Sequence, residues 1–180
     1  MAFGRLKQFW ANPAYRFVFL FAVLLGIEVV AYPMLTKRYF VVVETMTWLT
    51  AQLEYLLLSP FTDNVTIDGN LVFLDGFAVR IIEECTGVFE VIIFVAAVLA
   101  FPTIWAKRLI GLAMGIPLLY VFNVVRILVL ILVGRYYPDV FEFMHLYFWQ
   151  ATLILMITSV WLLWIFKVVR DEDETFPSIS

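Results

Sequence analysis

The sequence predicts an all-α integral membrane protein: a four-transmembrane-helix bundle with an outer amphipathic helix and a small outer β-hairpin. Three observations predict this class. Of the 180 residues 64% are hydrophobic, only 15% are charged, and the apolar residues gather in four long stretches. A soluble domain of this size carries about 25% charged residues. The sequence therefore lacks the charge to face water on all sides.

Residue counts exclude several other classes. The 12 Lys and Arg against 15 Asp and Glu offer no basic surface for nucleic acid. One Cys and one His exclude an internal disulfide and a Cys/His zinc site. We expect no metal and no cofactor.

Four stretches are long enough to cross about 30 Å of hydrocarbon as helices, which takes about 20 apolar residues each. We expect transmembrane helices over residues 17–35, 87–106, 109–133 and 148–166. No small-residue cleavage site follows the first stretch, so we expect it to stay in the mature protein. The ends, 1–16 and 167–180, then lie on one side of the membrane.

Basic residues near the helix ends predict which side that is, because loops rich in Lys and Arg stay cytoplasmic. With four spans, one side holds Arg5, Lys7, Arg16, Lys107, Arg108, Lys167 and Arg170. Both ends are therefore predicted to be cytoplasmic. Residues 36–86 and 134–147 are predicted to lie outside.

The outer segment 36–86 divides into two parts. Residues 41–58 carry Glu44, Gln52 and Glu54, and therefore predict an amphipathic helix that lies on the outer interface or packs over the bundle. Its apolar residues recur along one face: Val42, Met46, Leu49, Leu53, Leu56 and Leu57. Two Asp-Gly turns between β-prone runs predict the hairpin over 64–80.

Three chemically capable residues are predicted to meet near the outer edge of the membrane. Arg126 lies 17 residues beyond Leu109, roughly 26 Å above the cytoplasmic end of its helix. Cys85 lies just before the second span, and His145 lies just before the fourth. A thiolate nucleophile, an imidazole that exchanges protons and a fixed cation for an oxyanion are the parts of a cysteine acyl-transfer enzyme.

Each of the three also has an ordinary structural interpretation. A lone buried Cys is more often an inert apolar filler than a nucleophile. His145 lies among aromatic residues typical of a membrane interface, and Arg126 is also suited to reaching the outer headgroups. The coincidence of all three at one depth favours the catalytic interpretation about as strongly as the structural one.

Four further polar residues are candidates for supporting roles. Glu142 lies three residues before His145 on one helix face, where it orients the ring or is simply solvated. Asn123 lies one turn below Arg126, where it positions the guanidinium or forms an interhelical hydrogen bond. Glu28 and Glu90 lie inside spans, and both alternatives, a structural role or an ion pair with Arg126, stay open.

The motifs Glu84-Cys85-Thr86-Gly87, Asn123-Val124-Val125-Arg126 and the single His145 resemble the Cys, Arg and His motifs of the exosortase/archaeosortase family. The resemblance runs through nearly all of residues 17–167. The segment 141–150 is most similar to the exosortase H type. Two departures, Thr86 and the acidic Glu83-Glu84 pair, leave substrate preference open.

The resemblance implies a membrane-embedded cysteine protease and transpeptidase with Cys85, Arg126 and His145 as catalytic residues. It implies substrate proteins with a C-terminal motif, a transmembrane helix and a basic tail. For the H type that motif is Ile-Pro-Thr-Leu-x-x-Trp-Gly. It also implies the bacterial inner membrane, with the active site on the periplasmic side. The acceptor is not identified by the sequence.

A second class of function remains compatible with the sequence. A non-enzymatic four-span protein that binds a lipid or a partner helix would use the outer amphipathic helix and hairpin as a docking surface. In that protein Cys85 would be unreactive and replaceable. A transporter is less favoured, because the predicted core offers few polar residues along a path.

Overall fold

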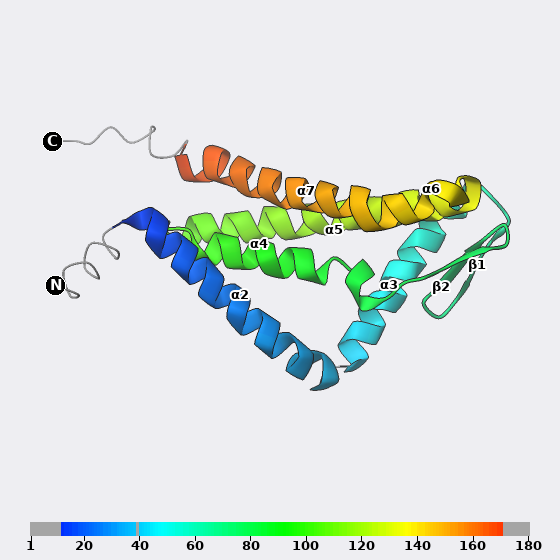
Figure 1. Cartoon of the computed structure of the whole chain (residues 1–180), viewed down its shortest axis with the longest axis horizontal. Helices are drawn as coiled ribbons and strands as arrows, with labels where there is room; N and C mark the ends of the chain where they lie inside the picture. Colours follow the sequence, from blue (N-terminus) through cyan, green and yellow to red (C-terminus); the bar gives the residue numbers. More distant parts are fainter. Residues whose placement is uncertain (1–11, 39, 171–180) are drawn as a thin grey trace.

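The computed structural model describes residues 12–38 and 40–170, and it is mostly helical (Figure 1). The described helices are α2 (Pro13–Arg38), α3 (Phe40–Leu58), η1 (Glu83–Cys85), α4 (Val88–Ala100), α5 (Trp105–Tyr136), α6 (Pro138–Phe143), η2 (Met144–Phe148), α7 (Trp149–Trp164) and η3 (Ile165–Arg170). The strands are β1 (Val65–Asp68), β2 (Leu71–Leu74) and β3 (Phe77–Arg80). The start of α2 and the end of η3 lie at one end of the molecule, here the terminal end, and the strands lie at the opposite or sheet end (Figure 1).

Three stretches of the described chain are long and apolar enough to cross a membrane: Pro13–Met34, Trp105–Tyr136 and Pro138–Arg170. The span expected at 87–106 is a shorter apolar helix, α4. Its 13 residues measure about 20 Å, against about 30 Å of hydrocarbon. Three of the four expected spans are therefore confirmed. The remaining one, the second along the chain, is too short to cross the membrane by itself. Pro102 explains where it ends, because a proline excludes the helical conformation from the residue before it.

α4 nevertheless forms the centre of the bundle, where it packs against α2, α5 and α7. Phe94 and Val98 of α4 are fully buried in a cluster with Leu119, Val160 and Trp164. The Phe94 ring occupies the place where a Cβ on Gly115 would stand, so glycine lets α4 and α5 approach closely.

The last helical stretch begins earlier than expected. Residues 134–147 were predicted as an outer loop, but α5 continues to Tyr136 and α6 begins at Pro138. Proline is favoured in the first helical turn, where its missing N–H needs no partner. The chain then continues through the wider π-helical turns of η2 into α7. His145 therefore lies on a helix and not on a loop.

The strands form a three-stranded antiparallel meander in the order β1-β2-β3, one strand more than the expected hairpin. Val72 is paired with Ile67 on one side and Val79 on the other. Asp75 and Gly76 both have positive φ, 48° and 86°, as a two-residue turn between right-twisted strands requires. One face of this sheet covers a second core cluster that contains Cys85.

α3 packs on the bundle with a face that differs from most of its apolar stripe. The buried residues of this helix are Thr47, Thr50, Ala51, Glu54 and Leu58. Most of the apolar stripe seen in the sequence is exposed: Val42, Met46, Leu49, Leu56 and Leu57. Small and polar residues at helix contacts with apolar residues outside are typical of membrane helices. The helix therefore packs over the bundle and presents an apolar surface outward.

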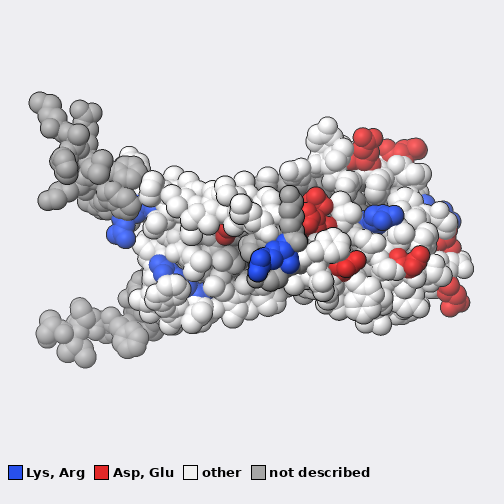
Figure 2. Space-filling model, turned by 90° about the horizontal axis from the view of Figure 1, so that it is seen from below, with Lys and Arg blue, Asp and Glu red and all other residues white. Residues whose placement is uncertain are grey.

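Charge is distributed unevenly along the molecule. In Figure 2 most of the visible acidic side chains lie in the half that holds the sheet. Basic residues at the terminal end include Lys107, Arg108, Lys167 and Arg170. The Lys107 ammonium donates to the Val169 carbonyl over 2.8 Å, and Trp164 Nε1 donates to the Lys107 carbonyl over 2.8 Å. These bonds join the first turn of α5 to the end of α7 and to η3.

Candidate active site

Cys85 ends the short helix η1, and α4 begins three residues later, at Val88. Its side chain is 9% exposed and belongs to the cluster between α3, the sheet and α5. The Thr86 hydroxyl donates to the Glu83 carbonyl over 2.6 Å and closes this turn. Glu84 is exposed, so its carboxylate points away from the buried thiol.

Gly87 is required where the turn passes α5. Its φ is +77°, a conformation that side chains rarely adopt. A Cβ at this position would lie 3.2 Å from the Asn123 side chain. The backbone of Gly87 and the amide of Asn123 are therefore in close contact.

We expect Gly87→Ala to destabilise the protein by about 1–3 kcal/mol, because it adds backbone strain and crowds Asn123. Thermal unfolding in detergent measures the effect as a lower Tm. Gly26→Ala is the matched control, since nothing lies within 4 Å of a Cβ there, and it should leave the Tm unchanged or slightly higher. Equal Tm values for Gly87→Ala and the wild type would show that the turn tolerates a side chain.

Asn123 joins α5 to the nucleophile candidate. Its side-chain amide donates to the Cys85 carbonyl over 2.6 Å, and the residue is fully buried. The sequence suggested that Asn123 positions the guanidinium of Arg126 or bonds between helices; the structure shows the interhelical bond, to Cys85. The amide oxygen, Oδ1, is buried and has no partner. An unpaired buried acceptor beside Cys85 is available to a bound molecule.

Arg126 lies one turn further along α5 and is 7% exposed. Its Nη1 donates to Glu90 Oε1 of α4 over 3.5 Å. Of the two candidate carboxylates, Glu28 and Glu90, Glu90 is therefore the one that pairs with Arg126. Helical side chains incline toward the N-terminus, so the guanidinium is directed back toward the level of Asn123. Arg126 Nε and Glu90 Oε2 are both buried without partners. The guanidinium of Arg126 therefore keeps one N–H donor, at Nε, without an acceptor.

His145 does not reach this group in the structure. Its ring is stacked on Phe141, with centroids 5.7 Å apart and planes 2° apart, and the side chain is exposed. The ring centroids of Phe122 in α5 and Trp149 in α7 are 6.5 Å apart, so these two residues lie at about the same level of the bundle. His145 lies four residues, or about 6 Å, further toward the sheet end than Trp149. It is therefore about one helical turn beyond the level of Asn123 and Cys85.

Glu142 is exposed and forms no hydrogen bond or ion pair with His145 in the described chain. Orientation of the imidazole by Glu142 therefore stays a prediction, and in the structure the imidazole is stacked on the Phe141 ring.

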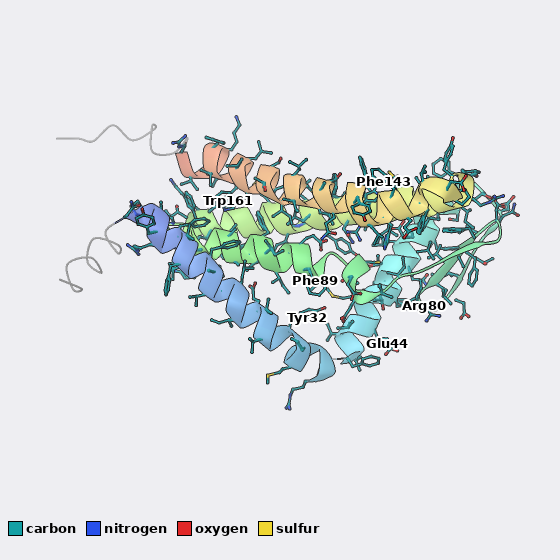
Figure 3. The ribbon with its side chains drawn as sticks, viewed as in Figure 1. Tyr32, Glu44, Arg80, Phe89, Phe143 and Trp161 are labelled. Carbon is teal, nitrogen blue, oxygen red and sulfur yellow. The ribbon has the colours of Figure 1, made fainter. Side chains whose placement is uncertain are left out.

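Two further acidic residues, Glu28 and Glu54, take no part in the ion pair of Arg126 with Glu90. Glu28 lies in a groove of about 270 Å³ between α2 and α4, away from Arg126. The rings of Tyr32 and Phe89 also line this groove, with their centroids 4.6 Å apart (Figure 3). Glu54 is fully buried on the inner face of α3, although the sequence analysis named it only among the polar residues of an amphipathic helix. The sequence signal for this burial was a carboxylate on the face of the helix that carries its small residues, in an otherwise mostly apolar segment.

These features define an integral membrane protein whose buried Cys, Asn and Arg–Glu pair form one polar layer in an apolar bundle. The family model described as Transmembrane exosortase (Exosortase_EpsH) matches residues 5–165. The chain therefore belongs to the exosortase family, a family of membrane sorting transpeptidases. No curated protein and no solved structure matches the chain.

Proposed function

We propose that this protein cleaves C-terminal sorting signals of exported proteins through a thioacyl intermediate on Cys85 and transfers the new carboxyl end to an acceptor. One observation carries the proposal. Asn123 holds the Cys85 backbone in the same layer in which the guanidinium of Arg126 keeps a buried, unpaired donor. A structural ion pair in an apolar bundle gains nothing from an unused donor, whereas an oxyanion requires one.

In this proposal the Cys85 thiolate attacks the scissile carbonyl carbon, and Arg126 stabilises the oxyanion that forms. Glu90 engages Nη1 and holds the planar group in place, so that Nε is left for the oxyanion. Such a donor, already oriented and desolvated, stabilises the transition state without reorganisation. A second nucleophile then attacks the thioester and releases Cys85.

His145 is proposed to protonate the leaving amine. An imidazole changes charge between pH 5 and 8, which suits this role. The separation of about one helical turn between His145 and the Cys85 layer leaves room for a substrate main chain to lie between them. Stacking on Phe141, which is itself in edge contact with Phe77 of β3 at 5.6 Å, supports the ring from the sheet.

The substrates are proposed to carry a short motif followed by a transmembrane helix and a basic tail, with the Ile-Pro-Thr-Leu-x-x-Trp-Gly signal as the first motif to test. The apolar groove between α2 and α4 suits the helix, because Leu25, Val29, Ile92 and Ile93 line it. Tyr32 lines this groove and lies near Glu83 of η1, the short helix that ends at Cys85. A helix in the groove would therefore lead its preceding motif to Cys85.

The experiment that tests this function is reconstitution in lipid vesicles. The purified chain is mixed with a substrate that ends in the motif, a transmembrane helix and a basic tail, and products are identified by mass spectrometry. Cleavage at the motif is expected, with the helix and tail released. A substrate of the same length with a scrambled motif is the control. Equal persistence of both substrates would reject the proposal.

The orientation proposed is that the terminal end is cytoplasmic and the sheet end is periplasmic, in the bacterial inner membrane. The basic residues at the terminal end and the acidic residues toward the sheet support it (Figure 2). Cys85, at the start of the 13-residue α4, then lies about 20 Å above the cytoplasmic turn, within the outer half of the bilayer.

Single cysteines at Asp68 or Asp139, in a Cys85→Ala background, are expected to react with a membrane-impermeant thiol reagent added outside the cell membrane. A cysteine at Thr103, in the turn between α4 and α5, is the matched control and should react only after the inner side is opened. The reverse pattern would overturn both the orientation and the periplasmic active site.

The alternative function is binding of a lipid or partner helix without catalysis. The exposed apolar face of α3 is the observation that favours it. It differs from the enzyme in one measurable respect: Cys85 would be dispensable.

A further inference from the structure

Glu54 is the most isolated ionisable side chain in the described chain. It is 0% exposed, and neither carboxyl oxygen has a hydrogen-bond partner. It lies on α3 three residues after Ala51 and four before Leu58, which makes these three residues one continuous stripe. Glu44, on the same helix, is exposed and offers a direct comparison (Figure 3).

This stripe faces Cys85. Ala51 and Leu58, on both sides of Glu54, belong to the same buried cluster as Cys85. α3 packs directly against η1, with Cα atoms within 8 Å of one another. The rest of the cluster is aliphatic, including Ile81, Ile127 and Ile131. The carboxyl group and the thiol therefore share one apolar environment from which water is excluded.

Burial raises the pKa of Glu54 to about 8, since charge is disfavoured in this environment. Ordinary thiols titrate near pH 8.5, so a proton passes between the two kinds of group at little cost. An exposed carboxylate would be a poor base for a thiol by about four pH units.

No charged group compensates Glu54. α3 packs against α2, α5, η1, β1 and β2, and β2 carries no titratable side chain. The titratable side chains described on the other four elements are Tyr15, Arg16, Glu28, Tyr32 and Arg38 of α2, Lys107, Arg108, Tyr120, Arg126, Arg135 and Tyr136 of α5, Glu83, Glu84 and Cys85 of η1, and Asp68 of β1. None of them is bonded to Glu54, and Arg126 is engaged with Glu90.

We propose that Glu54 is the residue with which the Cys85 thiol exchanges its proton. The proposal rests on the proposed transpeptidase function and assigns it a base that the geometry of His145 does not supply. Two like charges in one apolar cluster are strongly disfavoured, so a proton that leaves one of the two groups is favoured to stay on the other.

The proton balance closes over a full cycle. In acylation the S–H bond breaks and its proton goes to the ionised carboxylate of Glu54, the C–S bond forms, and the peptide C–N bond breaks as protonated His145 gives its proton to the leaving amine. In transfer the acceptor amine attacks the thioester and loses a proton to His145. The C–S bond breaks, and the departing sulfur takes its proton back from Glu54.

The test measures the thiol directly and needs no substrate. The purified protein reacts with methyl methanethiosulfonate from pH 6 to 10, and mass spectrometry follows modification of Cys85, the one cysteine of the sequence. Glu54→Gln, which keeps the shape but cannot ionise, is expected to shift the midpoint of the pH dependence downward by about one unit or more, because a nearby negative charge is lost at alkaline pH. Glu44→Gln is the matched control and should leave the midpoint unchanged.

Glu54→Asp, which retains the carboxyl, should keep the midpoint near that of the wild type and shows that any shift comes from charge. In the vesicle assay Glu54→Gln is expected to lower kcat by about 10²–10⁴, as loss of a general base does. Coincident midpoints for wild type, Glu54→Gln and Glu44→Gln would overturn the proposal. A shifted midpoint in a protein that cleaves no substrate would instead reject the transpeptidase function and leave the proton-sharing pair in place.

Discussion

Cys85→Ala is expected to abolish cleavage of a sorting-signal substrate while the protein still accumulates in the membrane. Removal of the nucleophile from a covalent enzyme costs about 10⁶ in kcat. The loss should not reflect unfolding, because Ala removes only the sulfur atom from a buried position. The measurement is single-turnover cleavage in vesicles, with the amount of folded protein determined in the same samples.

Cys85→Ser is expected to be nearly as inactive. A serine hydroxyl is a poor nucleophile at neutral pH without a strong base beside it, and the described chain places His145 about one turn away. Activity near that of the wild type in the Ala variant would eliminate the transpeptidase and favour the binding protein.

Arg126→Lys is expected to lower turnover by about 10²–10³, the usual cost of losing one oxyanion donor. Lys keeps the positive charge opposite Glu90 but loses the planar group that bonds Glu90 through Nη1 and offers Nε to the substrate. Substrate binding should change much less than kcat, since the lost bond forms only in the transition state.

Arg135→Lys is the matched control for this experiment. Arg135 lies on the same helix and also faces a carboxylate, Asp75, over 3.6 Å, but its side chain is 38% exposed and distant in sequence from the Cys85 contact. Its replacement should leave turnover near that of the wild type. If Arg126→Lys is equally active, Arg126 serves only to balance the charge of Glu90.

Much of the fold follows from the sequence, because length and hydropathy constrain membrane helices strongly. The spans at the two ends of the chain and around Arg126 were predicted, and so were the two Asp-Gly turns of the sheet. The length of α4 was not, since hydropathy continues across Pro102, where the helix has already ended. The extent of the last helix was missed because the charged and aromatic residues before Phe148 read as a loop.

The packing of α3 shows a limit of periodicity as a guide in this class of protein. A stripe of leucines indicates the buried face of a helix in water, but lipid is as apolar as a protein core. Thr47, Thr50, Ala51 and Glu54 form the packed face here. For this reason Glu54 was interpreted only as one of the polar residues of an amphipathic helix, and its burial was not predicted.

The candidate site was predicted in part. The sequence placed Cys85 and Arg126 at one depth, and the structure joins their surroundings through Asn123 and Glu90. The partners of Cys85 and Arg126 depend on the directions of side chains that meet between helices. The bonded residues, Asn123 with Cys85 and Arg126 with Glu90, are 38 and 36 residues apart in the chain. Periodicity within one helix contains no information about such a bond. The role of His145 stays a prediction, because its ring lies outside this layer.

The central claim, a covalent acyl-enzyme on Cys85, is tested most directly by capture of that intermediate. The protein in vesicles is given substrate without an acceptor, quenched in acid, digested and examined by mass spectrometry. We expect the peptide that contains Cys85 to carry the N-terminal part of the substrate through a bond that hydroxylamine cleaves, as it does a thioester. Cleaved substrate together with a Cys85 peptide that stays unmodified and fully alkylatable would contradict the account.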